Sequence, residues 1–155
     1  MRKAFGLMQA IMIILIMSGV ALLTLKFATL QSKHYSDTFL KEQAELFLQS
    51  ATEAALLEIS GFDRNDHNSC IKNINIISPD SLFIAEMNIS KYFLFNGKDN
   101  GGKDWPSNCR DRNKSIGYED SHGMILLEAV VESNDSHPKI GNSKIRIVRR
   151  SLQRP

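Results

Sequence analysis

The sequence is poor in residues that break helices. It contains four prolines and nine glycines among 155 residues, and neither type occurs between Gly19 and Gly61. Proline removes a helical hydrogen bond, and glycine costs about 1 kcal/mol relative to alanine. Their absence leaves this region free to form one uninterrupted helix. At this length the chain has room for one small domain and a membrane anchor.

Charged residues are absent from Ala4 to Leu25, although they make up 23% of the chain. An apolar run of about 20 residues matches the roughly 30 Å hydrocarbon core of a bilayer, whereas a removable signal peptide has an apolar part of about 7–15 residues. Lys26 stands where cleavage of a signal peptide needs a small side chain. The sequence therefore predicts a retained membrane helix. Arg2 and Lys3 place its N-terminus in the cytoplasm, because positive flanks stay on that side.

Neither sign of charge is in marked excess. The chain has 19 basic and 17 acidic residues, a formal net charge of +2, and this balance by itself indicates neither a nucleic-acid nor an acidic partner. Five basic residues gather near the C-terminus, namely Lys144, Arg146, Arg149, Arg150 and Arg154. Contact with nucleic-acid phosphates is one interpretation. The favoured one is a charged edge strand that discourages aggregation.

Residues 31–60 are predicted to continue the helix with an amphipathic pattern. Its apolar stripe recurs at spacings of four and three and consists of Leu40, Ala44, Phe47, Ala51 and Ala54, flanked by Leu48, Ala55 and Leu57. Ser60 and Gly61 are typical of a helix C-terminus. We therefore expect one helix from about Phe5 to Ser60, with a membrane and assembly half over 5–30 and an amphipathic half over 31–60.

Residues 61–155 are expected to form a β-rich globular part, because short apolar runs alternate there with turn-rich polar stretches. Strands are predicted at Ile71–Ser78, Ser81–Met87, Tyr92–Phe95, Met124–Glu132 and Lys144–Ser151. One antiparallel sheet packed on the apolar stripe of the helix would bury both elements. The predicted fold class is α+β, a long N-terminal helix packed on a small antiparallel sheet.

Cysteine is scarce, and Cys70 and Cys109 form the one available pair. In an oxidising compartment they would join, and a bond that closes about 40 residues stabilises a fold by about 4 kcal/mol in the chain-entropy model. Two free thiols are the alternative. His67 near Cys70 lacks the spacing of a zinc site, and the polar turn at Asp99–Asp104 lacks the EF-hand pattern. We predict no metal and no cofactor.

The first residues carry a recognisable processing pattern. A short basic leader, Met1-Arg2-Lys3-Ala4, ends in a small residue, and Phe5-Gly6-Leu7-Met8-Gln9 then opens the apolar helix with an aromatic residue. This segment resembles the prepilin-type N-terminus of type IV pilins, type II secretion pseudopilins and DNA-uptake pseudopilins, whose helix opens with a pattern like F-T-L-I-E. The resemblance covers about the first thirty residues.

The resemblance implies that a prepilin peptidase removes residues 1–4 by cutting between Ala4 and Phe5, and that the new amino group of Phe5 is methylated. It implies a bacterial inner-membrane protein with a periplasmic C-terminal domain, whose helix packs against other pilin-like subunits in a pseudopilus. Most members have glutamate where this chain has Gln9. In the family that carboxylate neutralises a neighbour's amino terminus, and the exceptions include tip subunits. Gln9 therefore favours a minor subunit.

Three asparagines stand in N-x-S acceptors, each with an acidic residue two places earlier. They are Asn88 after Glu86, Asn113 after Asp111, and Asn134 after Glu132. With 17 acids in 155 residues, chance would give all three about once in several hundred tries. The pattern resembles the extended acceptor of bacterial periplasmic oligosaccharyltransferases and predicts an N-glycosylated protein. Asn134, in a turn-like stretch, is the best acceptor, and Asn88, on a predicted strand, is the poorest.

Catalytic motifs are lacking. Neither a nucleophile elbow nor a phosphate loop accompanies the four histidines, so we predict no enzyme. Two hypotheses remain: a pilin-like filament subunit for protein secretion, pilus assembly or DNA uptake, and an uncleaved single-pass anchor for a periplasmic binding or scaffold domain. The order of basic leader, small residue and aromatic residue at Ala4 and Phe5 favours the first.

Overall fold

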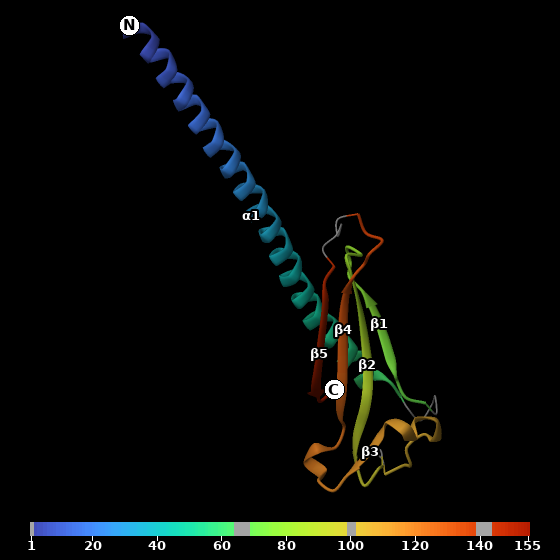
Figure 1. Ribbon diagram of the computed structural model, residues 1–155. Helices are drawn as coiled ribbons and strands as arrows, with labels where there is room; N and C mark the ends of the chain where they lie inside the picture. The colour runs from blue at the N-terminus through green and yellow to red at the C-terminus, as the bar shows by residue number, and fades with distance from the viewer. Residues whose placement is uncertain (1, 64–68, 99–101, 139–143) are drawn as a thin grey trace. The chain divides into compact units, whose positions relative to one another are not determined.

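The computed structural model describes residues 2–63, 69–98, 102–138 and 144–155. A single α-helix, α1, spans Arg2–Gly61, so the predicted uninterrupted helix is confirmed, and it ends at the predicted Gly61. The chain divides into two compact units, Met1–Leu40 and Lys41–Pro155. The first unit is the N-terminal part of α1, and the second holds the rest of α1 and all the strands (Figure 1).

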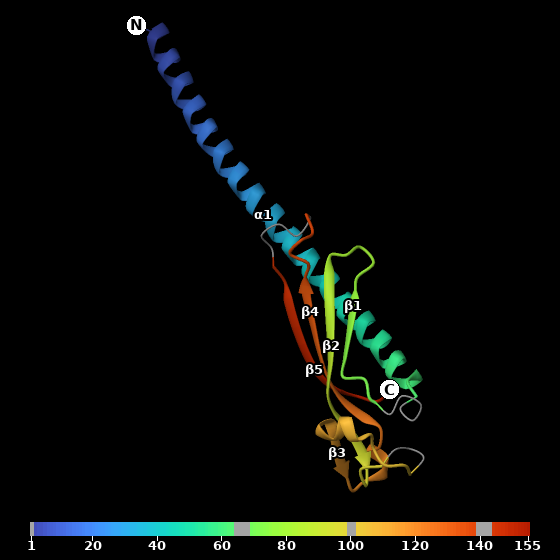
Figure 2. The same ribbon diagram turned by 90° about the vertical axis from the view of Figure 1, so that its right-hand side faces the viewer.

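The second unit contains one five-stranded sheet with the order β1-β2-β4-β5, and β3 pairs with β2 (Figure 2). The strands are β1 Asn73–Ile77, β2 Phe83–Phe95, β3 Asn113–Ile116, β4 Met124–Ser133 and β5 Arg146–Gln153; two short 3-10 helices, η1 Ser107–Arg112 and η2 Glu119–Ser121, precede β3 and β4. All pairings are antiparallel except that of β2 with β3, which is parallel. The predicted α+β fold class is confirmed.

Two strand predictions were wrong in detail. The segments expected at 81–87 and 92–95 form the single strand β2, whose pairing with β4 shifts register between Ile89 and Lys91. A bulge of this kind keeps apolar side chains on the buried face although the strict alternation is broken. The strand β3 was missed, because its sequence Asn-Lys-Ser-Ile has the polar character of a loop. It forms by pairing alongside the last residues of β2.

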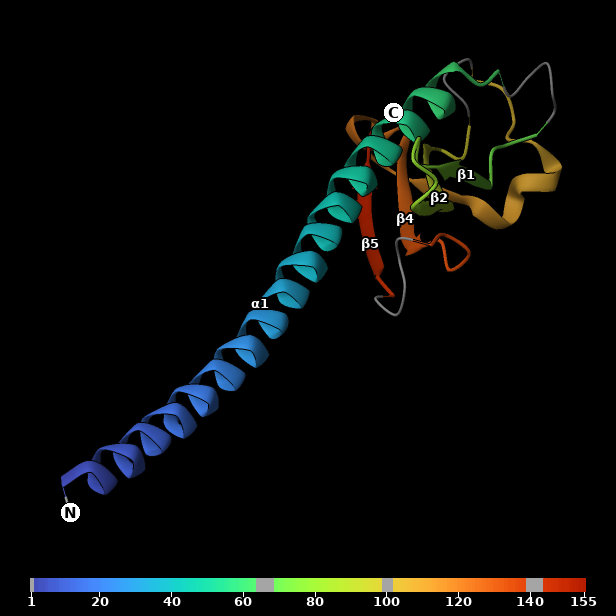
Figure 3. The same cartoon turned by 90° about the horizontal axis from the view of Figure 1, so that it is seen from above.

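The last part of α1 packs on one face of the sheet (Figure 3). Its buried side chains are Ala44, Leu48, Ala51, Ala55 and Ile59, each at most 1% exposed. The Phe47 ring lies 6.3 Å from the Phe83 ring at the start of β2. The sheet contributes alternate residues of its two central strands, Ala85, Met87 and Ile89 of β2 and Ile125, Leu127, Ala129 and Val131 of β4.

The predicted apolar stripe was therefore partly wrong. Ala54 is exposed and Leu57 is 75% exposed, whereas Ile59, which was not included, is fully buried. The last three buried positions of the helix, Ala51, Ala55 and Ile59, are separated by two consecutive steps of four residues. Because an α-helix has 3.6 residues per turn, a stripe with strictly alternating steps of three and four drifts off the buried face.

Two turns fix the ends of β2. At its start the Ser78 hydroxyl donates to Asp80 Oδ1 at 2.6 Å and accepts the Phe83 N–H at 2.9 Å. The Ser78 bond holds the pKa of the Asp80 carboxyl below its usual value. At its end Asn96 and Gly97 have φ of 51° and 71°, and the Lys98 N–H donates to the Phe95 carbonyl. Left-handed Asn-Gly pairs make tight reversals of this kind.

Candidate functional site

The N-terminal unit presents a continuous apolar surface. Every described side chain from Gly6 to Leu30 is exposed, including Leu7 at 70% and Ile14 at 65%. The most apolar 18-residue window of α1 reaches a mean hydropathy of 2.3, and none of that window is buried. By length and composition this helix is able to cross a membrane. Its apolar side chains need a cover of lipid or of other apolar helices.

Three hydroxyl groups in this surface are paired within the helix itself. The hydroxyls of Ser18, Thr24 and Thr29 each donate to the carbonyl three residues earlier, at 2.9 Å. Such internal bonds spare a helix the cost of unpaired donors in hydrocarbon. Gln9 is exposed, and within the described residues its side-chain amide has no hydrogen-bond partner. Gln9 is thus a polar group of this surface that is exposed to a neighbouring chain, as is Lys26.

The predicted processing residues lie at the start of α1. The backbones of Ala4 and Phe5 belong to the helix, and their side chains fall outside the described part of the structure. Gln9 follows Phe5 by four positions, one helical turn further along the same face. The structure thus brings the predicted cleavage and assembly residues onto one short helical segment.

The predicted disulfide between Cys70 and Cys109 is present, with a Cα–Cα distance of 6.2 Å. It joins the segment before β1 to η1, across 39 positions of the sequence. Cys109 is fully buried, and the Trp105 indole donates to its carbonyl at 3.1 Å. The Trp105 ring in turn lies 5.0 Å from the ring of Tyr92. The bond therefore anchors a small aromatic core at this end of the domain.

The three predicted acceptor asparagines have different surroundings. Asn88 lies within β2, flanked by Asn73 of β1 and Glu128 of β4. Asn113 opens β3, and its amide donates to the Gly97 carbonyl at 3.1 Å while its Oδ1 is buried. Asn134 follows β4 in an exposed turn, where its Oδ1 accepts the Ser136 N–H at 3.1 Å. The structure thus keeps the three acceptors apart, on two strands and one loop.

Sequence reasoning missed the role of Arg112. Its guanidinium donates to Asn88 Oδ1 at 2.8 Å and to the Ile89 carbonyl, so it holds β2 beside the bulge. Nothing in the local sequence of Arg112 indicates this contact, because the residues it joins are more than twenty positions away. Arg112 ties one predicted acceptor asparagine into the fold.

The basic C-terminal strand is largely compensated. Across the β4–β5 pairing, Arg146 contacts Glu132 at 2.7 Å and Arg150 contacts Glu128 at 3.2 Å. Lys144 contacts Asp135 at 2.6 Å. Exposed pairs of this kind contribute at most about 1 kcal/mol each. Their effect here is to reduce the positive potential that this strand offers to phosphates.

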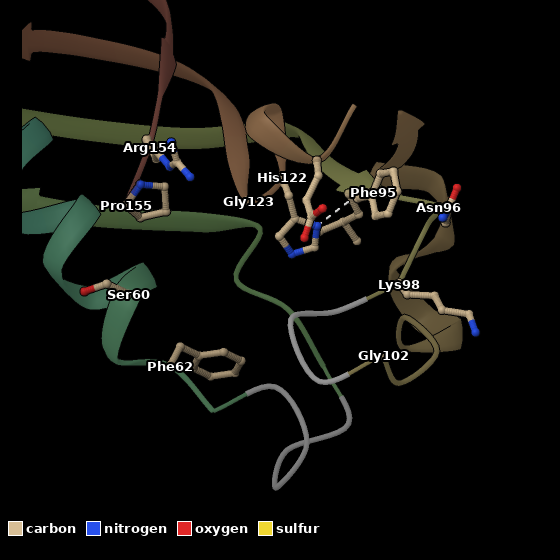
Figure 4. Close-up of a pocket in the computed structure, with 12 residues that line it drawn as sticks. Ser60, Phe62, Phe95, Asn96, Lys98, Gly102, His122, Gly123, Arg154 and Pro155 are labelled. Atoms are coloured by element: carbon tan, nitrogen blue, oxygen red, sulfur yellow. Dashed lines mark hydrogen bonds between the residues drawn. The ribbon is translucent and has the colours of Figure 1, made fainter. Parts of the chain in front are cut away.

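A cleft of about 660 Å³ in the described domain lies between the end of α1, the end of β2 and the C-terminal residues (Figure 4). Phe62, Lys98, Glu119 and Arg154 are among its lining residues. His122 also lines it, and its Nδ1 accepts the Phe95 N–H at 2.9 Å. This bond occupies the Nδ1 lone pair and makes His122 a structural acceptor for the strand end.

Within the described residues no group of three or more histidine, cysteine, aspartate or glutamate side chains is placed to hold an ion. Residues 99–101 of the predicted polar turn at 99–104 lie outside the described residues, and His67 also lies outside them.

Comparisons of the chain with protein-family models, with curated proteins and with solved structures find no match.

Proposed function

We propose that this chain is a pilin-like structural subunit, a minor pseudopilin of a type II secretion or type IV pilus-type filament machine, including those that take up DNA. The observation that carries the proposal is the division of α1 into an exposed apolar part and a part whose apolar face the sheet buries. A helix with these two properties holds a periplasmic domain on a segment that either lipid or other helices can cover.

The partners follow from this assignment. Other pilin-like subunits pack against the apolar half of α1, the inner membrane holds the subunit before assembly, and a prepilin peptidase releases residues 1–4. In most pilin-like subunits a glutamate at this position pairs with the charged amino terminus of a neighbouring subunit. Gln9 has a neutral amide there instead. An uncompensated charge in hydrocarbon is costly, so Gln9 suits a minor or tip subunit that receives no such neighbour.

Nucleic acid is the less favoured partner. Three of the five basic residues near the C-terminus are engaged by acidic neighbours on the same surface. Binding to DNA gains affinity from releasing counterions at unpaired cationic side chains. We therefore propose that β5 acts as a charged edge, and that any role in DNA uptake is structural. No catalytic step is proposed for this chain.

The alternative is an uncleaved single-pass anchor for a periplasmic binding or scaffold domain. It shares the apolar helix and differs in the fate of residues 1–4. Replacement of Ala4 by arginine, Ala4→Arg, is expected to block leader removal in the native host, because the peptidase site needs a small side chain at that position. The intact mass of the purified protein is the measurement.

The matched control is Ala4→Gly, which keeps a small residue at the junction. Wild type and Ala4→Gly should both lose residues 1–4, whereas Ala4→Arg should retain them. Equal chain lengths for all three proteins, each with residues 1–4 retained, would establish the anchor and exclude the filament subunit.

A further inference from the structure

We propose that Asn134 is the one N-x-S asparagine of this chain that is glycosylated on the folded domain. The substrate class is an oligosaccharide joined through pyrophosphate to a membrane lipid. This inference requires export of the domain and is independent of filament assembly. It starts from the three acceptors that share an acidic residue two places before the asparagine, a coincidence expected about once in several hundred tries.

Asn134 is half-buried and is held in a defined conformation, in a turn whose next two residues, Asp135 and Ser136, are exposed. Its backbone N–H donates to the Leu82 carbonyl at 2.8 Å, and its side-chain Oδ1 accepts the Ser136 N–H. This arrangement is an Asx turn, and it joins the acceptor asparagine to the serine of its own N-x-S motif. The Asn134 amide nitrogen donates one hydrogen to the Ser81 carbonyl at 3.0 Å. An amide carries two hydrogens, so this bond leaves the second one unused.

The elements of the motif share one surface. A shallow groove of about 270 Å³ is lined by Glu132, Asn134 and Ser136 together with neighbouring residues. The acidic side chain of Glu132 is 54% exposed and is paired with the exposed Arg146. A surface pair of this kind is weak and exchanges readily for another cationic partner. A transferase can therefore reach the acid, the acceptor and the serine from one side.

Asn88 is half-buried like Asn134, but its backbone is held by a strand on either side. It lies in the middle of β2 with a paired strand on either side, and Arg112 donates to its Oδ1. To enter an enzyme's active site, the segment around Asn88 would have to leave both neighbouring strands. That movement breaks the hydrogen-bond ladder of the central strand, which belongs to the most stable class of structure in a domain.

Asn113 is held in a different way. Its amide nitrogen donates to the Gly97 carbonyl, and its Oδ1 is buried. The segment also pairs with the end of β2. The Oδ1 atom of the reacting amide is thus enclosed by the domain, and strand pairing holds the backbone around it. Asn88 and Asn113 carry the same acceptor motif as Asn134, so the fold, and not the motif, separates them.

The proposed step is a group transfer without a change of oxidation state. The Asn134 Nδ2 atom forms a bond to the anomeric carbon of the oligosaccharide, and the bond from that carbon to the pyrophosphate oxygen breaks. The lipid pyrophosphate leaves with the electron pair, and one amide proton passes to a base of the transferase. The product carries a neutral side-chain amide, so the charge of the domain is unchanged.

The test is the mass of glycopeptides and of the intact protein from the native host. We expect one glycan on wild type, located on the peptide that contains Asn134. Asn134→Gln should lose it, whereas Asn88→Gln and Asn113→Gln should keep it. Glu132→Gln should lower the occupied fraction at least severalfold, because the acidic residue takes part in recognition.

A second pair of variants leaves Asn134 itself in place. Ser136→Ala should abolish the glycan, and Ser136→Thr should keep it, because threonine retains the hydroxyl of the motif. An intact Cys70–Cys109 bond in each variant reports that the domain has folded. A wild-type mass equal to that of the processed polypeptide, or a glycan on Asn88 or Asn113, would overturn the proposal. Retention of the glycan in Asn134→Gln would do the same.

Discussion

Loss of the Cys70–Cys109 bond is expected to lower the free energy of unfolding by about 4 kcal/mol, because the bond closes a loop of about 40 residues in the unfolded chain. This loss is a large fraction of the total free energy of unfolding of a typical domain, which is roughly 5–15 kcal/mol. The double variant Cys70→Ala with Cys109→Ala should therefore unfold at a much lower urea concentration than the oxidised protein.

The measurement is urea unfolding of the full chain in detergent micelles, followed by the fluorescence of Trp105. This is the one tryptophan of the sequence, and it is 6% exposed beside the disulfide. The reduced wild-type protein is the matched control and should behave like the double variant. Unfolding midpoints that are equal with and without the bond would contradict the stabilising role of the disulfide.

Replacement of Leu48 by alanine is expected to lower the free energy of unfolding by about 2–5 kcal/mol, the range for a buried leucine. Leu48 is fully buried between α1 and the sheet. Leu46, two positions earlier on the same helix, is 69% exposed. Leu46→Ala removes the same atoms from an exposed site and should change stability by no more than about 0.5 kcal/mol.

The two leucine variants form a matched pair, since helix propensity changes by the same amount in both. Urea unfolding of each full-length variant gives the comparison. Equal losses would mean that the sheet does not cover the Leu48 face of α1. A larger loss for Leu46→Ala would place the opposite face of the helix against the sheet.

The long helix could be predicted because a single property decides it. No proline or glycine interrupts the chain from Gly19 to Gly61, and the apolar run is long enough to cross a bilayer. The face that the helix buries was harder to predict. Leu57 is as apolar as Leu48 but is exposed, and the sequence pattern alone does not say which of two neighbouring stripes the sheet covers.

The sheet could be predicted in its well-patterned strands and not elsewhere. β4 alternates buried and half-exposed residues along most of its length, and that pattern is visible in the sequence. The middle of β2 contains the polar residues Asn88 and Lys91. The register also shifts between Ile89 and Lys91, so the sequence shows no continuous alternation there. The strand β3 forms by pairing with β2, so its local sequence does not predict it.

The candidate sites also differ in how far the sequence predicts them. The disulfide could be predicted by elimination, because only two cysteines exist. The three acceptor motifs could be found, and a turn favoured Asn134. The contacts of Asn113 with Gly97 and of Arg112 with Asn88 join residues that are distant in sequence. Contacts of that kind follow from the tertiary fold, and a single sequence contains no pattern for them.

The mass of the N-terminal peptide from protein purified from its native host tests the central proposal most directly. A pilin-like subunit predicts a peptide that begins at Phe5 with a methylated amino group. That result would join the exposed apolar half of α1 to filament assembly. A peptide that begins at Met1 would contradict the proposal and leave a single-pass anchor for the exported domain.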